Sequence, residues 1–79
     1  MKAKITQYVS FDQISQVALN IIQNEIGLEN IEAIGYGVGA YAKAPLIIKT
    51  KNGETYKLTT TLTLYKLQKN KWKTIKKHQ

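Results

Sequence analysis

The chain has 79 residues, of which 43% are hydrophobic and 22% are charged, a composition typical of one small folded domain and too apolar for a disordered segment. Its twelve basic residues are all lysines and outnumber the five acidic residues, which gives a formal net charge of +7. Cysteine is absent, so the composition excludes a disulfide framework and a thiolate metal site.

The first two predicted elements are a strand and a helix. Residues 2–9 alternate imperfectly between apolar and polar side chains and predict the strand. Ser10 and Gln13 have the spacing of a capping box, and Gly27 stands where a left-handed helix stop is favoured. Between them, apolar residues recur at helical spacing and form one stripe: Phe11, Ile14, Val17, Ala18, Ile21, Ile22 and Ile26. The pattern therefore predicts a helix over residues 11–26.

After the helix the hydrophobic period changes to two, which is typical of strands. The predicted strands are residues 31–43, 45–51, 54–67 and 72–76. Asn52-Gly53 is the strongest short-range hairpin signal because both residue types tolerate positive φ. A second turn is predicted at residues 68–71.

Short connections between strands favour antiparallel neighbours. We therefore predict a single α+β domain with the element order β-α-β-β-β-β, in which the helix covers one face of a curled sheet and the other, threonine-rich face is solvated. This order resembles the cystatin-type fold, where a helix is wrapped by a later antiparallel sheet. The resemblance is one of topology only. The family's inhibitor motif Gln-x-Val-x-Gly would fall at residues 36–40, where Tyr36 and Ala40 replace its two ends. The Pro-Trp of the family's second hairpin appears here as Lys71-Trp72. Protease inhibition is therefore not implied.

Two regular patterns in the strands favour structural roles. Three glycines spaced by two, Gly35, Gly37 and Gly39, lack the following helix of a dinucleotide-binding loop. They indicate a bend or the close approach of another backbone. Thr59, Thr61 and Thr63 alternate along the return strand and predict a solvated sheet face.

Signals for catalysis are weak. The only histidine, His78, is next to last, and Ser10, one of two serines, is explained as a helix cap. The acidic residues are scattered, so no pair of carboxylates with divergent pKa values is predicted. We therefore predict a protein that is not an enzyme, with no catalytic residue, no cofactor and no metal ligand.

Charge is the most informative feature of the sequence. Residues 1–32 carry two lysines and four acidic residues, whereas residues 33–79 carry ten lysines and one acidic residue. The last hairpin holds six of these lysines, with Tyr65 and Trp72 among them. The predicted partner-binding residues are Tyr65, Lys66, Lys69, Lys71, Trp72, Lys73 and Lys76. Simple alternation places Lys71, Lys73 and Lys77 on one face of the hairpin, and Trp72 with Lys76 on the other.

A basic patch fixes the sign of a partner and not its kind. We expect a small basic binding protein, an inhibitor or adaptor of the sort that phages and mobile elements encode, which engages an acidic protein surface. The alternative is sequence-nonspecific nucleic-acid binding, although the lack of arginine disfavours bidentate base reading. Lysines on edge strands also protect against aggregation without any partner. A homodimer is a further expectation for so small a core.

No apolar run approaches the length of a membrane span, and no secretory signal is recognised. We therefore expect a cytoplasmic protein without a membrane partner.

Overall fold

The computed structural model describes residues 4–37 and 45–77. The predicted tail around His78 and the part of the second strand beyond Gly37, including Gly39, lie outside the described residues. The elements in chain order are β1 (Ile5–Tyr8), the 3-10 turn η1 (Phe11–Gln13), α1 (Gln16–Glu25), the 3-10 turn η2 (Leu28–Asn30), β2 (Ile31–Gly37), β3 (Leu46–Thr50), β4 (Thr55–Leu58), β5 (Thr63–Gln68) and β6 (Lys71–Lys77).

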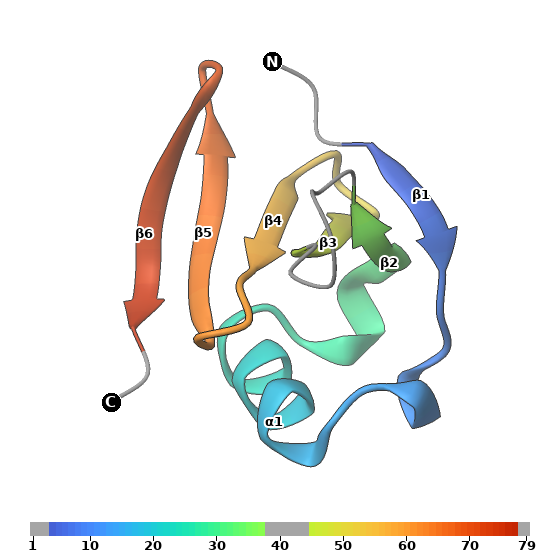
Figure 1. Ribbon diagram of the computed structural model, residues 1–79. Helices are drawn as coiled ribbons and strands as arrows, with labels where there is room; N and C mark the ends of the chain where they lie inside the picture. The colour runs from blue at the N-terminus through green and yellow to red at the C-terminus, as the bar shows by residue number, and fades with distance from the viewer. Residues whose placement is uncertain (1–3, 38–44, 78–79) are drawn as a thin grey trace.

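The described strands form one antiparallel sheet in the order β1-β2-β3-β4-β5-β6, and α1 lies against it (Figure 1). The predicted α+β class, with one helix packed on a curled antiparallel sheet, is confirmed. Because each strand pairs with its neighbours in sequence, the two edges of the described sheet are β1 and β6. None of the described helices is long and apolar enough to cross a membrane.

The core lies between α1 and the inner face of the sheet. Its buried members are Ala18, Ile21 and Ile22 from the helix and Ile34, Leu46, Ile48, Tyr56, Leu58 and Leu64 from the strands. Ile22, Ile48 and Leu64 are fully buried. These residues share the predicted apolar stripe of the helix and alternate positions of the strands, so hydrophobic burial explains why the two layers pack together. Phe11 and Val17, at the edge of the helical stripe, are exposed.

The predicted start of the helix is wrong. Ser10 and Gln13 do form a capping interaction, in which the Ser10 N–H donates to Gln13 Oε1 at 2.8 Å, but it closes the 3-10 turn η1. Ile14 then adopts an extended conformation, and α1 begins after Ser15, whose hydroxyl accepts the Ala18 N–H at 3.3 Å. Two serines five residues apart offer competing caps, and the second starts the α-helix.

The predicted return strand 54–67 is two strands. A turn over residues 59–62 separates β4 from β5, and Leu62 takes φ 65° within it. Thr59 and Thr61 turn their hydroxyls toward each other at 2.9 Å, while Thr63 is buried. The three threonines therefore organise a hairpin turn, and the predicted row of solvated hydroxyls is wrong. Local side-chain hydrogen bonds from threonine offset the left-handed backbone that leucine ordinarily avoids.

Gly35 of β2 permits a close approach, as predicted, and the approaching backbone is that of β1. A Cβ on Gly35 would lie 2.3 Å from the Gln7 carbonyl oxygen and 2.5 Å from the Ile5 side chain. Gly35 pairs with Ile47 on the face away from α1, and both Ile5 and Ile47 are buried there. The predicted outer face is therefore not uniformly solvated, because β1 curls over it at a register shift between Ile5 and Gln7.

Two tight turns complete the sheet. The hairpin predicted at Asn52-Gly53 is confirmed, with Gly53 at φ 89° between β3 and β4. The turn between β5 and β6 contains two residues, Lys69 at φ 50° and Asn70 at φ 65°. Positive φ at both positions is the type I′ geometry, whose twist matches that of the flanking strands. This turn aligns the lysine-rich β6 closely with β5.

Candidate functional site

The β5–β6 hairpin carries all seven predicted partner-binding residues and stands at one end of the sheet. Its turn lies far from α1 in Figure 1, and β6 has a neighbouring strand on one side only among the described strands. Every residue of β6 is exposed except Trp72, which is half-buried. β6 therefore presents its outer edge and both of its faces to solvent.

The register of the hairpin places three of its lysines on the face opposite its aromatic residues. Residues paired across an antiparallel ladder point to the same face. On the helix-side face, Lys71, Lys73 and Lys76 pair with Gln68, Lys66 and Leu64. On the opposite face, Trp72, Thr74 and Lys77 pair with Leu67, Tyr65 and Thr63. We call the first set of three lysines, Lys71, Lys73 and Lys76, the lysine face.

The predicted placement of Lys76 and Lys77 is wrong. Simple alternation groups Lys77 with Lys71 and Lys73, but the register shifts between Leu64 and Tyr65. Tyr65 pairs with Thr74 and Leu64 pairs with Lys76, so β6 holds one extra residue, Ile75. A β-bulge of this kind exchanges the faces of all later side chains. It brings Lys76 onto the lysine face and moves Lys77 to the other side.

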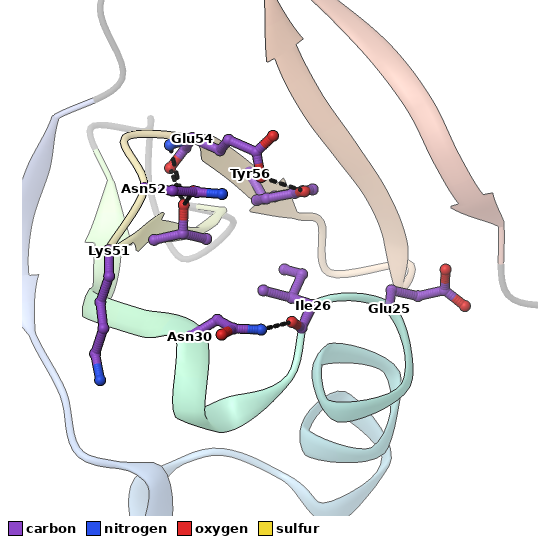
Figure 2. Close-up of a pocket in the computed structure, with 8 residues that line it drawn as sticks. Glu25, Ile26, Asn30, Lys51, Asn52, Glu54 and Tyr56 are labelled. Atoms are coloured by element: carbon purple, nitrogen blue, oxygen red, sulfur yellow. Dashed lines mark hydrogen bonds between the residues drawn. The ribbon is translucent and has the colours of Figure 1, made fainter.

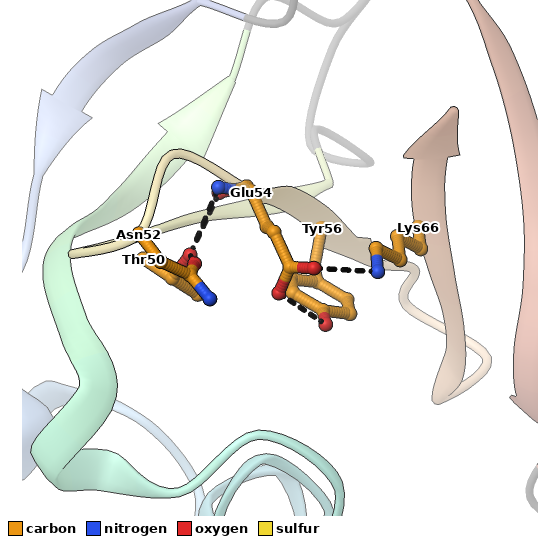
Figure 3. Close-up of polar contacts among 5 residues, drawn as sticks. All are labelled: Thr50, Asn52, Glu54, Tyr56 and Lys66. Atoms are coloured by element: carbon orange, nitrogen blue, oxygen red, sulfur yellow. Dashed lines mark hydrogen bonds and ion pairs between the residues drawn. The ribbon is translucent and has the colours of Figure 1, made fainter. Parts of the chain in front are cut away.

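Lys66 points to the same side of the hairpin as the lysine face, but it forms an ion pair within the protein. Its Nζ lies 2.6 Å from Glu54 Oε2, and the Tyr56 hydroxyl donates to Glu54 Oε1 at 3.1 Å (Figure 3). The hydrogen bond from Lys66 lowers the pKa of the Glu54 carboxyl, and the same contact raises the pKa of Lys66. Burial raises the pKa of the Tyr56 hydroxyl. Glu54 thus offsets the charge of Lys66, which pairs across the ladder with Lys73.

On the opposite face, Lys57 lies over both aromatic rings of the hairpin. Its Nζ is 4.5 Å from the Trp72 ring centroid and 5.2 Å from that of Tyr65. Sequence reasoning missed Lys57 as part of this region because it lies on β4. The alternation of residues 54–67 already places Lys57 and Tyr65 on one face of the sheet. In the structure, the turn at residues 59–62 then brings them opposite each other on paired strands.

A polar hollow of about 340 Å³ lies between the end of α1 and the β3–β4 turn (Figure 2). Its lining residues are Glu25, Ile26, Asn30, Thr50, Lys51, Asn52, Glu54 and Tyr56. Several of them bond to the protein itself: Asn30 donates to the Ile26 carbonyl at 2.7 Å, and Thr50 donates to Asn52. Glu25 and Lys51 stand on opposite sides of the hollow in Figure 2. The polar groups inside are therefore largely used for folding.

A second hollow of about 410 Å³ lies beside the start of α1 and is lined mainly by apolar and hydroxyl side chains. Tyr36, Leu46 and Leu58 form its sheet side, and Ile14 and Ala18 its helix side. Within the described ranges, no group of three histidine, cysteine or acidic side chains could hold a metal ion. Within the part of the chain that the structure describes, the hairpin is the region where positive charge, exposure and a strand edge without a neighbour coincide.

Comparison of the chain with protein-family models, with curated proteins and with solved structures gave no match. We therefore infer the function from the geometry of the hairpin.

Proposed function

We propose that this chain is a small basic binding protein, not an enzyme, which acts as an inhibitor or adaptor by engaging an acidic protein surface through its sheet and its last hairpin. The lysine face, formed by Lys71, Lys73 and Lys76 on an exposed edge hairpin, is the single observation that carries the proposal. Within the described part of the chain, no acidic side chain forms an ion pair with these three lysines. A concentrated positive field of this kind speeds encounter with an acidic partner.

The other predicted binding residues have supporting positions. Lys69 lies in the exposed turn, Lys66 lies on the lysine face beside Glu54, and Tyr65 and Trp72 flank the hairpin on its other side. A partner that wraps the hairpin would therefore meet the lysine face on one side and, on the other, the Tyr65 and Trp72 rings together with Lys57 and Lys77. Aromatic residues are enriched at the well-packed centres of protein interfaces.

Nucleic-acid binding is less well supported by the same geometry. Stacking proteins combine a cationic groove with aromatic rings that bases can reach at the same time. Here the lysine face and the aromatic residues point to opposite sides of the hairpin, and Lys57 already covers the Trp72 and Tyr65 rings. A strand of nucleic acid lying on the lysine face would not reach Trp72, so its bases would lack a stacking partner there.

The test compares two charge reversals of equal size. Lys71→Glu/Lys73→Glu alters the lysine face, whereas Lys4→Glu/Lys51→Glu changes the net charge equally at exposed positions outside the hairpin. Binding of each full-length variant to polyglutamate and to mixed-sequence single-stranded DNA is measured over a range of salt concentrations. We expect the hairpin variant to lose about tenfold or more in affinity for polyglutamate and most of its salt dependence, and the control variant to lose far less.

Equal losses in the two variants would show that net charge alone drives association, and the proposed site would be wrong. Tighter binding of DNA than of polyglutamate at the same salt concentration, with log K falling steeply as log salt rises, would favour the nucleic-acid alternative.

The proposal includes a cytoplasmic location, which the cysteine-free composition fits. It also includes a homodimer. Because Gly35 and Gly37 are buried, we place the dimer contact at the β1 edge, where Tyr8 is 69% exposed. A sedimentation mass equal to one chain at micromolar concentration would remove the dimer from the proposal.

A further inference from the structure

The geometry points to strand addition as the way in which this hairpin holds its partner: β6 accepts an extended segment that alternates acidic and apolar residues, laid against Lys71–Thr74. This inference rests on the proposed function and specifies the chemistry of the partner. It depends on three features of β6, which are its free backbone edge, its alternation of side chains and the position of its bulge.

Among the described residues, β6 has a neighbouring strand on one side only. β6 is a seven-residue strand that ends the described sheet. In an antiparallel ladder, alternate residues of an edge strand turn their N–H and C=O groups away from the neighbouring strand. These groups are the attachment points used when an extended peptide adds to a sheet, because main-chain hydrogen bonds supply affinity and side chains supply specificity.

The side chains of β6 select the sequence of such a segment. Lys71 and Lys73 point to the lysine face, and Trp72 and Thr74 point to the opposite face. An added strand places its own alternate residues beside them, and opposite charges stabilise such neighbours while like charges destabilise them. Acidic residues at alternate positions would meet Lys71 and Lys73, and apolar residues between them would lie beside Trp72.

The bulge limits the length of the docking strand. Pairing between β5 and β6 is regular from Lys71 to Thr74 and shifts at Ile75. Bulges twist an edge strand away and are a common means of stopping further pairing. The regular docking edge is therefore Lys71–Thr74, and Lys76 beyond the bulge contributes charge without continuing the alternation.

A second copy of this chain is a poor occupant of the edge. Pairing β6 with another β6 would place lysines of one strand beside lysines of the other, and like charges across strands are destabilising. The lysines that disfavour pairing of this edge with a second copy of the chain or with a neutral strand are also the groups that attract an acidic strand. The occupant is therefore a segment of a different, acidic protein.

The experiment uses the full-length protein and three short peptides. One peptide alternates glutamate and valine, one has the same composition with the glutamates together and the valines together, and one is the alternating peptide with N-methyl groups on alternate backbone nitrogens. Binding is followed by the fluorescence of Trp72, the only tryptophan, and by hydrogen exchange of the β6 amides. Because these changes are made in the peptides, this arm of the experiment does not alter the folding of the protein.

We expect the alternating peptide to bind, to shift the Trp72 fluorescence and to slow amide exchange within Lys71–Thr74. The rearranged and N-methylated peptides should bind about tenfold more weakly or worse, since each removes one of the two contributions that strand addition requires. As a second arm, Lys71→Glu/Lys73→Glu should lose the glutamate peptide and gain binding of an alternating lysine–valine peptide.

Equal binding of the alternating, rearranged and N-methylated peptides, without protection of the β6 amides, would overturn strand addition and leave the proposed acidic-surface binding intact. Failure of all three peptides and of polyglutamate at low salt would overturn both. Protection of the same amides by single-stranded DNA, or by raising the protein concentration alone, would show that the occupant is a nucleic acid or a second copy.

Discussion

At the scale of single residues, Glu54 links β4 to β5. Its two carboxylate oxygens take the Lys66 ammonium at 2.6 Å and the Tyr56 hydroxyl at 3.1 Å. The Glu54 backbone N–H in turn donates to the Thr50 hydroxyl at 3.0 Å, which holds the β3–β4 turn closed (Figure 3). One acidic residue in a basic half of the chain thus fixes the strand on which the lysine-rich hairpin is built.

This cluster predicts a specific pH dependence of stability. The pKa of Glu54 is lowered on folding, so its contribution is present above its ordinary pKa and is lost as pH falls through the lowered value. Glu54→Gln should therefore flatten the acid limb of the free energy of unfolding, measured by denaturant titration, and should lower stability at neutral pH. The exposed Glu25→Gln is the control. An acid limb of unchanged slope in Glu54→Gln would contradict the assignment.

At high pH the same cluster acts in the opposite direction. The pKa values of Lys66 and Tyr56 are raised on folding, so their contributions are present at neutral pH and are lost as pH rises through the raised values. Lys66→Met should therefore lose less stability than the wild type between neutral and strongly alkaline pH. The measurement is the same denaturant titration, and an identical alkaline decline in both proteins would contradict it.

Gly35 is a second residue with a specific structural role, because the backbone of β1 lies directly against it. An alanine methyl group there would meet the Gln7 carbonyl oxygen at 2.3 Å, and backbone cannot move aside as a flexible side chain can. We expect Gly35→Ala to cost at least about 3 kcal/mol, the upper part of the range for overpacking. Gly53→Ala has open space and only a positive φ to oppose it, so it should cost about 1 kcal/mol. Equal costs would show that β1 does not press on β2 as described.

At the scale of elements, the start of α1 provides a direct test of the capping assignment. Ser15 caps the α-helix through Ala18, whereas Ser10 closes a 3-10 turn. We expect Ser15→Ala to destabilise the protein by about 1 kcal/mol, as loss of a helix N-cap does. Ser10→Ala should cost less, because η1 buries no residue. Thermal unfolding of both variants checks this, and a larger loss from Ser10→Ala would reverse the assignment.

The elements that the sequence predicts well are those set by hydrophobic period and by strong turn residues. The apolar stripe of α1, its stop at Gly27 and the Asn52-Gly53 hairpin follow from side-chain spacing and from glycine's tolerance of positive φ. The features that the sequence does not predict arise where two local signals compete. Leu62 adopts a left-handed conformation inside what reads as one continuous strand, because the threonine hydroxyls beside it close a turn.

The sequence identifies the hairpin that carries the candidate site, but it predicts neither the arrangement of the side chains nor the part played by Lys57. Counting lysines and aromatic residues identifies the last hairpin, but the bulge at Ile75 decides which side each lysine occupies. This bulge adds one residue without an accompanying glycine or proline, so no sequence pattern predicts it. Lys57 enters the region only after the β4–β5 turn has placed it opposite Tyr65.

At the scale of the whole molecule, the acidic residues and the lysines lie in different parts of the fold. Four of the five acidic residues lie within residues 1–32, which include α1 and both 3-10 turns, and ten of the twelve lysines follow residue 32. The hairpin turn and α1 lie at opposite ends of the molecule in Figure 1. Under the proposed function, such a separation would orient the protein as it approaches an acidic surface, so that the β5–β6 hairpin would arrive first.

The most direct test of this account is an amide-resolved NMR titration of the full-length protein with the alternating glutamate–valine peptide at low salt. We predict that chemical shift changes concentrate on Lys69–Lys76 and on Lys57, and that they shrink as salt is added. Changes spread evenly over exposed lysines such as Lys4 and Lys51, or centred on α1, would contradict the claim that one face and edge of the hairpin hold the partner.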